Sequence, residues 1–151
     1  MEPAEDIMPE MKPKPAARLA AVQAVFQAEQ DDAGIDRIVA QFLEHRMQPT
    51  ADKRLFENIV RGVVGTVPVI DQQIRPALSD KWTVQRLDPT LRAILRCGVY
   101  ELTAHSDLAI GTILQNYVDL AGAFFSDKET AFANAVLDRI ARDLRPQEGN
   151  A

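Results

Sequence analysis

Apolar side chains recur every three to four residues through most of this chain, which is the spacing of an amphipathic α-helix. The first such stripe predicts a helix from about Ala16 to Gln30. The stripes begin, in chain order, at Leu19, Ile35, Phe56, Leu91, Ile110 and Phe132. No window alternates apolar and polar residues long enough to form a half-buried strand. The pattern therefore predicts an all-α fold.

Several polar residues and prolines indicate where these helices begin or break. Pro68 interrupts the stripe that starts at Phe56, so two helices with a kink between them are expected there. Asp88 followed by Pro89 is typical of a helix N-cap and its first position. Ser126 with Glu129 has the spacing of a capping box, which predicts the start of the last long helix.

The length of 151 residues suits one domain. We expect this domain to span residues 15–146. Residues 1–14 are expected to form a disordered tail, because Pro3, Pro9 and Pro13 within it and Pro15 directly after it oppose a helix, and few apolar side chains could be buried. Residues 147–151 form a second expected tail. With 46% hydrophobic residues, the rest of the chain has enough apolar surface for a core.

The chemistry that the sequence could support is limited. The single cysteine, Cys97, allows no intrachain disulfide and no thiolate cluster. His45 and His105 are isolated, and no phosphate-binding loop or nucleophile motif occurs. We therefore expect no enzyme activity, no cofactor and no metal. No apolar stretch approaches the roughly 20 residues of a membrane span, and the N-terminus lacks a signal peptide's apolar region, so a cytoplasmic protein is expected.

The net charge of −5 bears on the class of partner. A strongly basic surface, which is the usual sign of a nucleic-acid-binding domain, is absent. Any RNA binding must therefore come from a local patch of cations.

Five segments of the chain, in order, resemble the bacterial transcription antitermination factor NusB family. These segments are AARLAAVQAVFQ, RLFENIVRGVV, RLDPTLRAILRCGVYEL, YVDLAGAFF and FANAVLDRIA. The resemblance implies a seven-helix fold, with an N-terminal three-helix group packed on a C-terminal four-helix group. It also implies binding of single-stranded boxA RNA from ribosomal RNA operons, together with the ribosomal protein NusE, in the RNA polymerase antitermination complex. The free protein would be a monomer or a homodimer.

The resemblance implies RNA contacts at the start of the first helix. Where the family has an arginine-rich start, this chain has Lys12, Lys14 and Arg18. Phosphate is held readily at a helix N-terminus, where free N–H groups and the positive end of the dipole lie. Gln23, on the polar side of the same helix, could reach a base edge. The alternative is that these side chains are merely solvated, in a diverged protein-interaction module with weakened or lost RNA binding.

A second set of candidate RNA contacts is Lys81, Trp82 and Arg86, in the loop before the Asp88 cap. An indole ring can stack on an unpaired base while flanking cations hold phosphates. Alternatively, the tryptophan folds back and fills the gap between the two helical groups. Arg92 and Arg96, one turn apart, could bind phosphate or pair with carboxylates such as Glu101.

The candidate protein-partner contacts lie in the C-terminal half. Tyr100 and Glu101 match the family's Tyr-Glu-Leu signature, although such a tyrosine usually packs in the core. Gln115 and Asn116 stand where the family usually has Asn-Glu, and Asp119 follows one turn later. The resemblance implies that these five residues face NusE.

Overall fold

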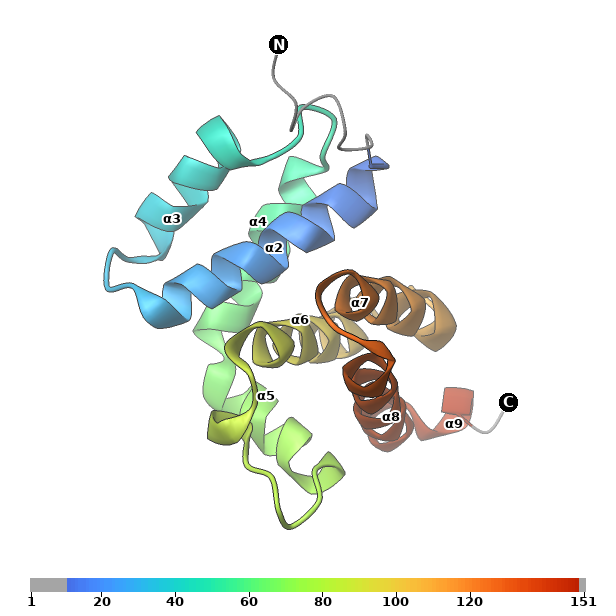
Figure 1. Cartoon of the computed structure of the whole chain (residues 1–151). Coiled ribbons are helices and arrows are strands. Elements are labelled where there is room, and N and C mark those ends of the chain that lie inside the picture. Colours follow the sequence, from blue (N-terminus) through green and yellow to red (C-terminus); the bar gives the residue numbers. More distant parts are fainter. Residues whose placement is uncertain (1–10, 150–151) are drawn as a thin grey trace.

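The computed structural model describes residues 11–149, and within this range every regular element is a helix. The N-terminal group consists of α2 (Pro13–Gln30), α3 (Ile35–Gln41) and α4 (Lys53–Gly65), with one π-helical turn, η1 (Phe42–Arg46), directly after α3. The C-terminal group consists of α5 (Val67–Ile74), α6 (Pro89–Ala104), α7 (Ile110–Phe124) and α8 (Asp127–Leu144) (Figure 1). A short helix, α9 (Pro146–Gly149), follows them. The predicted all-α fold and its grouping of three helices and four helices are confirmed for the described part of the chain.

Helix α6 is the central element of the fold. It contacts α2 and α4 on one side, and α5, α7 and α8 on the others (Figure 1). Its residues from Leu91 to Val99 are all buried, including two arginines. The hydrophobic core is therefore continuous between the N-terminal and C-terminal groups, and α6 joins them.

The two chain ends differ from the sequence-based boundaries. α2 begins at Pro13 rather than near Ala16, with Pro13 and Pro15 both in its first turn. Proline is tolerated there because the first N–H groups of a helix have no acceptor within the helix. At the other end, Pro146–Gly149 is helical although a tail was expected from residue 147. The rest of the two expected tails, residues 1–10 and 150–151, lies outside the described residues.

Two predicted helix signals are confirmed. The helix expected to break near Pro68 does so, since α4 ends at Gly65 and α5 begins at Val67. The Asp88 carboxylate accepts hydrogen bonds from the backbone N–H groups of Thr90 (2.8 Å) and Leu91 (3.2 Å) at the start of α6.

The expected capping box before α8 takes a different form. Ser126 is the N-cap residue, but its hydroxyl donates to the Glu129 carboxylate and makes no hydrogen bond with a backbone N–H group. The serine hydroxyl therefore pairs with the glutamate rather than with a free N–H group of the helix. Hydrogen bonds from the Ser126 hydroxyl and from the backbone at Glu129 and Ser126 lower the pKa of the Glu129 carboxyl, so the glutamate half of the expected box is present.

Buried ion pairs attach α6 to its neighbours. Arg92 donates to the Glu29 carboxylate at the end of α2 and to backbone carbonyls in the loop before α6. Arg96 donates to both Asp71 oxygens on α5, at 2.9 and 2.8 Å. Of the two uses expected for these arginines, the structure shows pairing with carboxylates, although the partners are Glu29 and Asp71 rather than Glu101. Both guanidinium groups therefore form structural ion pairs between α6 and its neighbouring helices.

Candidate nucleic-acid and partner interface

Lys12 is the N-cap residue of α2, and Lys14 stands on the first turn of this helix. Both side chains are exposed, and the Lys12 carbonyl accepts a hydrogen bond from the Ala16 N–H at 3.0 Å. The carbonyl of Pro13 accepts from the Asp52 N–H at 3.0 Å, which ties this end of α2 to the start of α4. The two lysines are therefore presented on a fixed helix N-terminus, where the helix dipole adds to their attraction for an anion.

Arg18, the third member of the expected basic patch, points into the protein. Its Nε and Nη2 donate to the two Glu101 oxygens at 2.7 and 3.0 Å, and both side chains are almost fully buried. The Glu101 carboxylate also accepts from the Tyr117 hydroxyl and lies 2.8 Å from His105 Nδ1. An expected phosphate contact and an expected partner contact thus bind each other, and Arg18 also lines a groove between α2 and α7. The physical reason for the pairing is that a buried charge needs a partner of opposite charge.

This pair shifts the ionisation of both groups. Burial alone would raise the pKa of Glu101, but hydrogen bonds from Arg18 and Tyr117 and the charge of Arg18 bring that pKa below its ordinary value. Burial lowers the pKa of Arg18, yet the bond with Glu101 and its charge raise it overall. The pKa of Tyr117 lies well above its ordinary value because the phenol is buried and faces the Glu101 charge. Arg18 and Glu101 are thus held in their charged forms and Tyr117 in its neutral form.

A groove runs beside the first half of α2 and contains Gln23. It has a volume of about 350 Å³ and is lined by Met11, Ala16, Leu19, Ala20, Gln23, His45, Arg46, Met47 and Gln48. Gln23, the candidate base contact, therefore lines the same groove as His45 and Arg46 at the end of η1. From the sequence, His45 was considered only for a metal or catalytic role, and Arg46 was not singled out.

A second, more apolar groove of about 420 Å³ separates α2 from α7. Its walls include Pro15, Leu19 and Gln23 from α2, and Asn116, Asp119, Leu120, Ala123 and Phe124 from α7. Phe124 is 44% exposed, and Phe26, 37% exposed, lies with it in an adjoining hollow. Two exposed aromatic rings beside the expected partner residues Asn116 and Asp119 are typical of a protein-docking surface.

These two phenylalanines were missed by the sequence analysis. Phe26 was assigned to the apolar stripe of the first helix, and Phe124 was not singled out. The adjacent pair Phe124 and Phe125 could have given the signal, because two large apolar side chains at the end of a helix point in different directions and one of them can remain uncovered.

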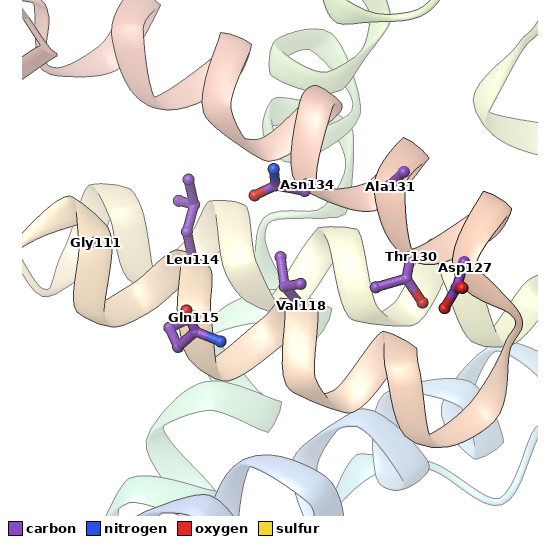
Figure 2. Close-up of a pocket in the computed structure, with 8 residues that line it drawn as sticks. All are labelled: Gly111, Leu114, Gln115, Val118, Asp127, Thr130, Ala131 and Asn134. Carbon is purple, nitrogen blue, oxygen red and sulfur yellow. The ribbon is translucent and has the colours of Figure 1, made fainter.

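Gln115 belongs to a different side of α7. It lines a third groove, between α7 and α8, in which Leu114 and Val118 form the apolar wall (Figure 2). Its Nε2 donates to Asp119 Oδ1 at 2.7 Å, and the Asn116 Nδ2 donates to the carbonyl of Thr112 at 2.8 Å. The expected partner residues of α7 therefore lie along two grooves rather than one.

Tyr100 lies on a further surface, against α4. Its hydroxyl donates to Asn58 Oδ1 at 3.3 Å, and its ring covers Gly62 so closely that no side chain would fit there. Tyr100 and Glu101 are thus not brought together with the exposed residues of α7.

The loop with Lys81, Trp82 and Arg86 is remote from the start of α2. The segment between α5 and α6 lies at the bottom of Figure 1, whereas α2 begins at the upper right. Trp82 is 46% exposed and rests against Phe132, with 6.5 Å between ring centroids, so it does not fill the gap between the helical groups. The Arg86 Nη1 donates to the Lys81 carbonyl at 3.3 Å. The structure thus divides the two sets of candidate RNA contacts between opposite ends of the molecule.

Within residues 11–149 no cluster of three or more His, Cys, Asp and Glu side chains could hold a metal ion. Burial, and then the nearby Glu101 charge, raise the pKa of the Cys97 thiol. A thiol with a raised pKa is a poor nucleophile. No helix in this range has the length and apolar character needed to cross a membrane.

Comparison with known proteins adds independent information. The model of the NusB family matches residues 15–142. "Transcription antitermination protein NusB" of Sphingopyxis alaskensis is 42% identical over 138 residues, which are 86% of this chain and 93% of the relative. The protein of the same name from Sinorhizobium fredii is 42% identical over 95% of this chain and 94% of its own length.

Two experimental structures have the same fold. T. maritima NusB matches with a TM-score of 0.78 and 29% identity, covering 93% of this chain and all of its own. A chain of a crystal structure of antitermination factors NusB and NusE in complex with dsRNA matches with a TM-score of 0.75 and 22% identity, covering 85% of this chain and 96% of its own. The match of the family model over most of the chain, together with these relatives, shows that this chain belongs to the NusB family.

Proposed function

We propose that this chain is a cytoplasmic, non-enzymatic transcription antitermination factor that binds boxA RNA of ribosomal RNA operons together with NusE. The observation that carries this proposal is the family match over residues 15–142, joined by full-length relatives named for transcription antitermination. A structural neighbour of the same fold was crystallised with NusE and RNA, which supports the two classes of partner.

The RNA would lie across the first half of α2. Lys12 and Lys14 are exposed at its N-terminus, and Gln23 lies about two and a half turns after Lys14, in the adjoining groove. The lysines would bind phosphate oxygens, which positions an RNA strand without specifying its sequence. The amide of Gln23 could then donate to and accept from one base edge. Arg18 has no part in this proposal, because it is paired with Glu101 in the core.

NusE would dock over the groove between α2 and α7. The exposed rings of Phe26 and Phe124 supply apolar contact area, and Asn116 and Asp119 supply polar contacts beside them. Large aromatic side chains at the centre of an interface commonly carry most of its binding energy. Gln23 lines both this groove and the groove assigned to RNA, so the two partners would touch one another at α2.

The docking surface can be tested with Phe124→Ala and a matched control, Val69→Ala. Val69 is an exposed apolar residue on α5, 54% accessible and outside the α2–α7 groove. Calorimetric titration with NusE should show binding weakened about ten-fold or more by Phe124→Ala and unchanged by Val69→Ala. If both variants lose NusE affinity equally, or if neither loses any, NusE does not bind at the groove between α2 and α7.

The function itself is tested by transcription in vitro. A template should carry boxA upstream of a terminator, and a second template should carry a scrambled boxA. The chain together with NusE should increase terminator read-through on the first template only. Increased read-through on neither template would contradict the proposal, and NusE binding without RNA binding would indicate a diverged protein-interaction module instead.

A further inference from the structure

Arg46 occupies a position between the two faces described above. It is the last residue of the π-helical turn η1, its side chain is exposed, and it lines the groove that contains Gln23. It also lines the adjoining hollow that contains Phe26 and Phe124. A cation from a different element therefore stands beside α2, at the place where the proposed RNA path meets the proposed NusE surface.

The guanidinium group of Arg46 is held in place without being neutralised. Its central carbon lies 4.2 Å from the centroid of the Phe42 ring, and its Nη1 donates to Gln27 Oε1 at 2.7 Å. Gln27 in turn donates to Gln41 Oε1 at 3.4 Å. Phe42 is fully buried, so the ring beneath the guanidinium is fixed by the core. Among the ion pairs of residues 11–149 none includes Arg46, which leaves its charge and its Nε and Nη2 donors available.

The π-helical turn accounts for this placement. A π-helix bonds each residue to the fifth one along, so one more residue fits into the turn and the following side chains are displaced around the axis. Such turns occur frequently at functional sites. In η1 the turn keeps Phe42 in the core while Arg46 projects beside α2.

We propose that Arg46 is a phosphate contact for single-stranded RNA, which supplies on this face the charge that the buried Arg18 cannot supply. This inference rests on the proposed function. The strand would pass from Lys12 and Lys14 along α2 to Arg46, and a phosphate would accept hydrogen bonds from Nε and Nη2 in the bidentate manner that suits a guanidinium. The fixed position of the group reduces the entropy lost on binding.

The test uses three variants of the full chain and a fluorescein-labelled single-stranded boxA oligonucleotide, followed by fluorescence anisotropy over a salt series. Arg46→Gln removes the charge. Arg37→Gln is the matched control, since Arg37 is an exposed arginine on α3 outside both grooves, and the change in net charge is the same. Gln27→Leu keeps the Arg46 charge but removes the acceptor that holds it. Thermal melts followed by circular dichroism establish that each variant is folded.

Arg46→Gln should weaken RNA binding about ten-fold, as expected for loss of hydrogen bonds to a charged group. It should also make the slope of log affinity against log salt shallower by about 0.7. Arg37→Gln should change neither quantity by a comparable amount. Gln27→Leu should weaken binding less and leave the slope unchanged, because the charge remains and only its placement is lost.

The possible negative results distinguish failure of the Arg46 assignment from failure of the proposed function. If the parent chain binds RNA and Arg46→Gln behaves as Arg37→Gln does, the assignment of Arg46 is overturned while the proposed function stands. If Arg46→Gln loses affinity for NusE and keeps its affinity for RNA, Arg46 serves the protein partner and the inference is also overturned. If the parent binds no RNA, with or without NusE, the proposed function and this inference both fail.

Discussion

Removing Arg18 should leave the buried Glu101 carboxylate without its arginine partner, with only the Tyr117 hydroxyl and His105 beside its charge. Breaking a buried ion pair by removing one partner costs about 3–5 kcal/mol. That is a large part of the roughly 5–15 kcal/mol by which a domain is stable. Arg18→Met retains most of the apolar length of the side chain, so the expected loss reflects the unpaired charge rather than a cavity. Urea unfolding followed by far-UV circular dichroism measures the free energy of unfolding directly.

Two further variants separate the effect of the isolated Glu101 charge from the effect of losing an arginine side chain. The double variant Arg18→Met with Glu101→Gln should regain part of the lost stability, because the isolated charge is gone. Arg61→Met is the control, since Arg61 pairs with Asp36 and Glu57 at the exposed surface, and exposed pairs contribute little. If Arg18→Met destabilises the protein as little as Arg61→Met does, or if the double variant is no more stable than Arg18→Met alone, the buried pair does not stabilise the fold in this way. Arg18 would then return as a candidate phosphate contact.

Further predictions concern pH, packing, capping and RNA. The pKa of Glu101 is lower in the folded protein than in the unfolded chain, so its stabilising contribution is present above about pH 4.3 and is lost as the pH falls through the folded value. The stability gap between the parent and Glu101→Gln should therefore narrow on acidification in urea titrations. Gly62→Ala should destabilise the protein by about 1–3 kcal/mol, because a Cβ there would overlap the Tyr100 ring, and thermal melts will show the loss. Asp88→Ala should cost about 1 kcal/mol in the same urea assay, through loss of the α6 cap. Trp82→Ala should weaken RNA binding by about 1–3 kcal/mol if a base stacks on the indole; unchanged anisotropy titrations would remove this loop from the RNA site.

The helices could be predicted from the sequence because their signals are local. The break near Pro68 and the cap at Asp88 depend on residues within one turn of each other, and both are confirmed. The start of α2 was misplaced because proline was treated as a helix breaker, although it is accommodated in the first turn of a helix.

The candidate site was less predictable because its decisive contacts are distant in sequence. Nothing near Arg18 indicates that its partner is Glu101, 83 residues away. The same holds for Arg92 and Arg96, whose carboxylates lie on α2 and α5. Arg46 was overlooked because its place beside α2 depends on a π-helical turn, which the apolar pattern does not reveal. Helical periodicity indicates which side chains share a face, but not which face remains uncovered.

Titration of boxA RNA in the presence and absence of NusE is the decisive test of whether this chain binds RNA together with NusE. The charge available on α2 and η1 is small, so the chain alone should bind RNA weakly. NusE held at the α2–α7 groove should raise the RNA affinity, because a second RNA-binding surface on the same complex acts at a high effective concentration. We expect a marked gain in RNA affinity with NusE, and loss of that gain in Phe124→Ala. Equal RNA affinity with and without NusE would contradict this expectation.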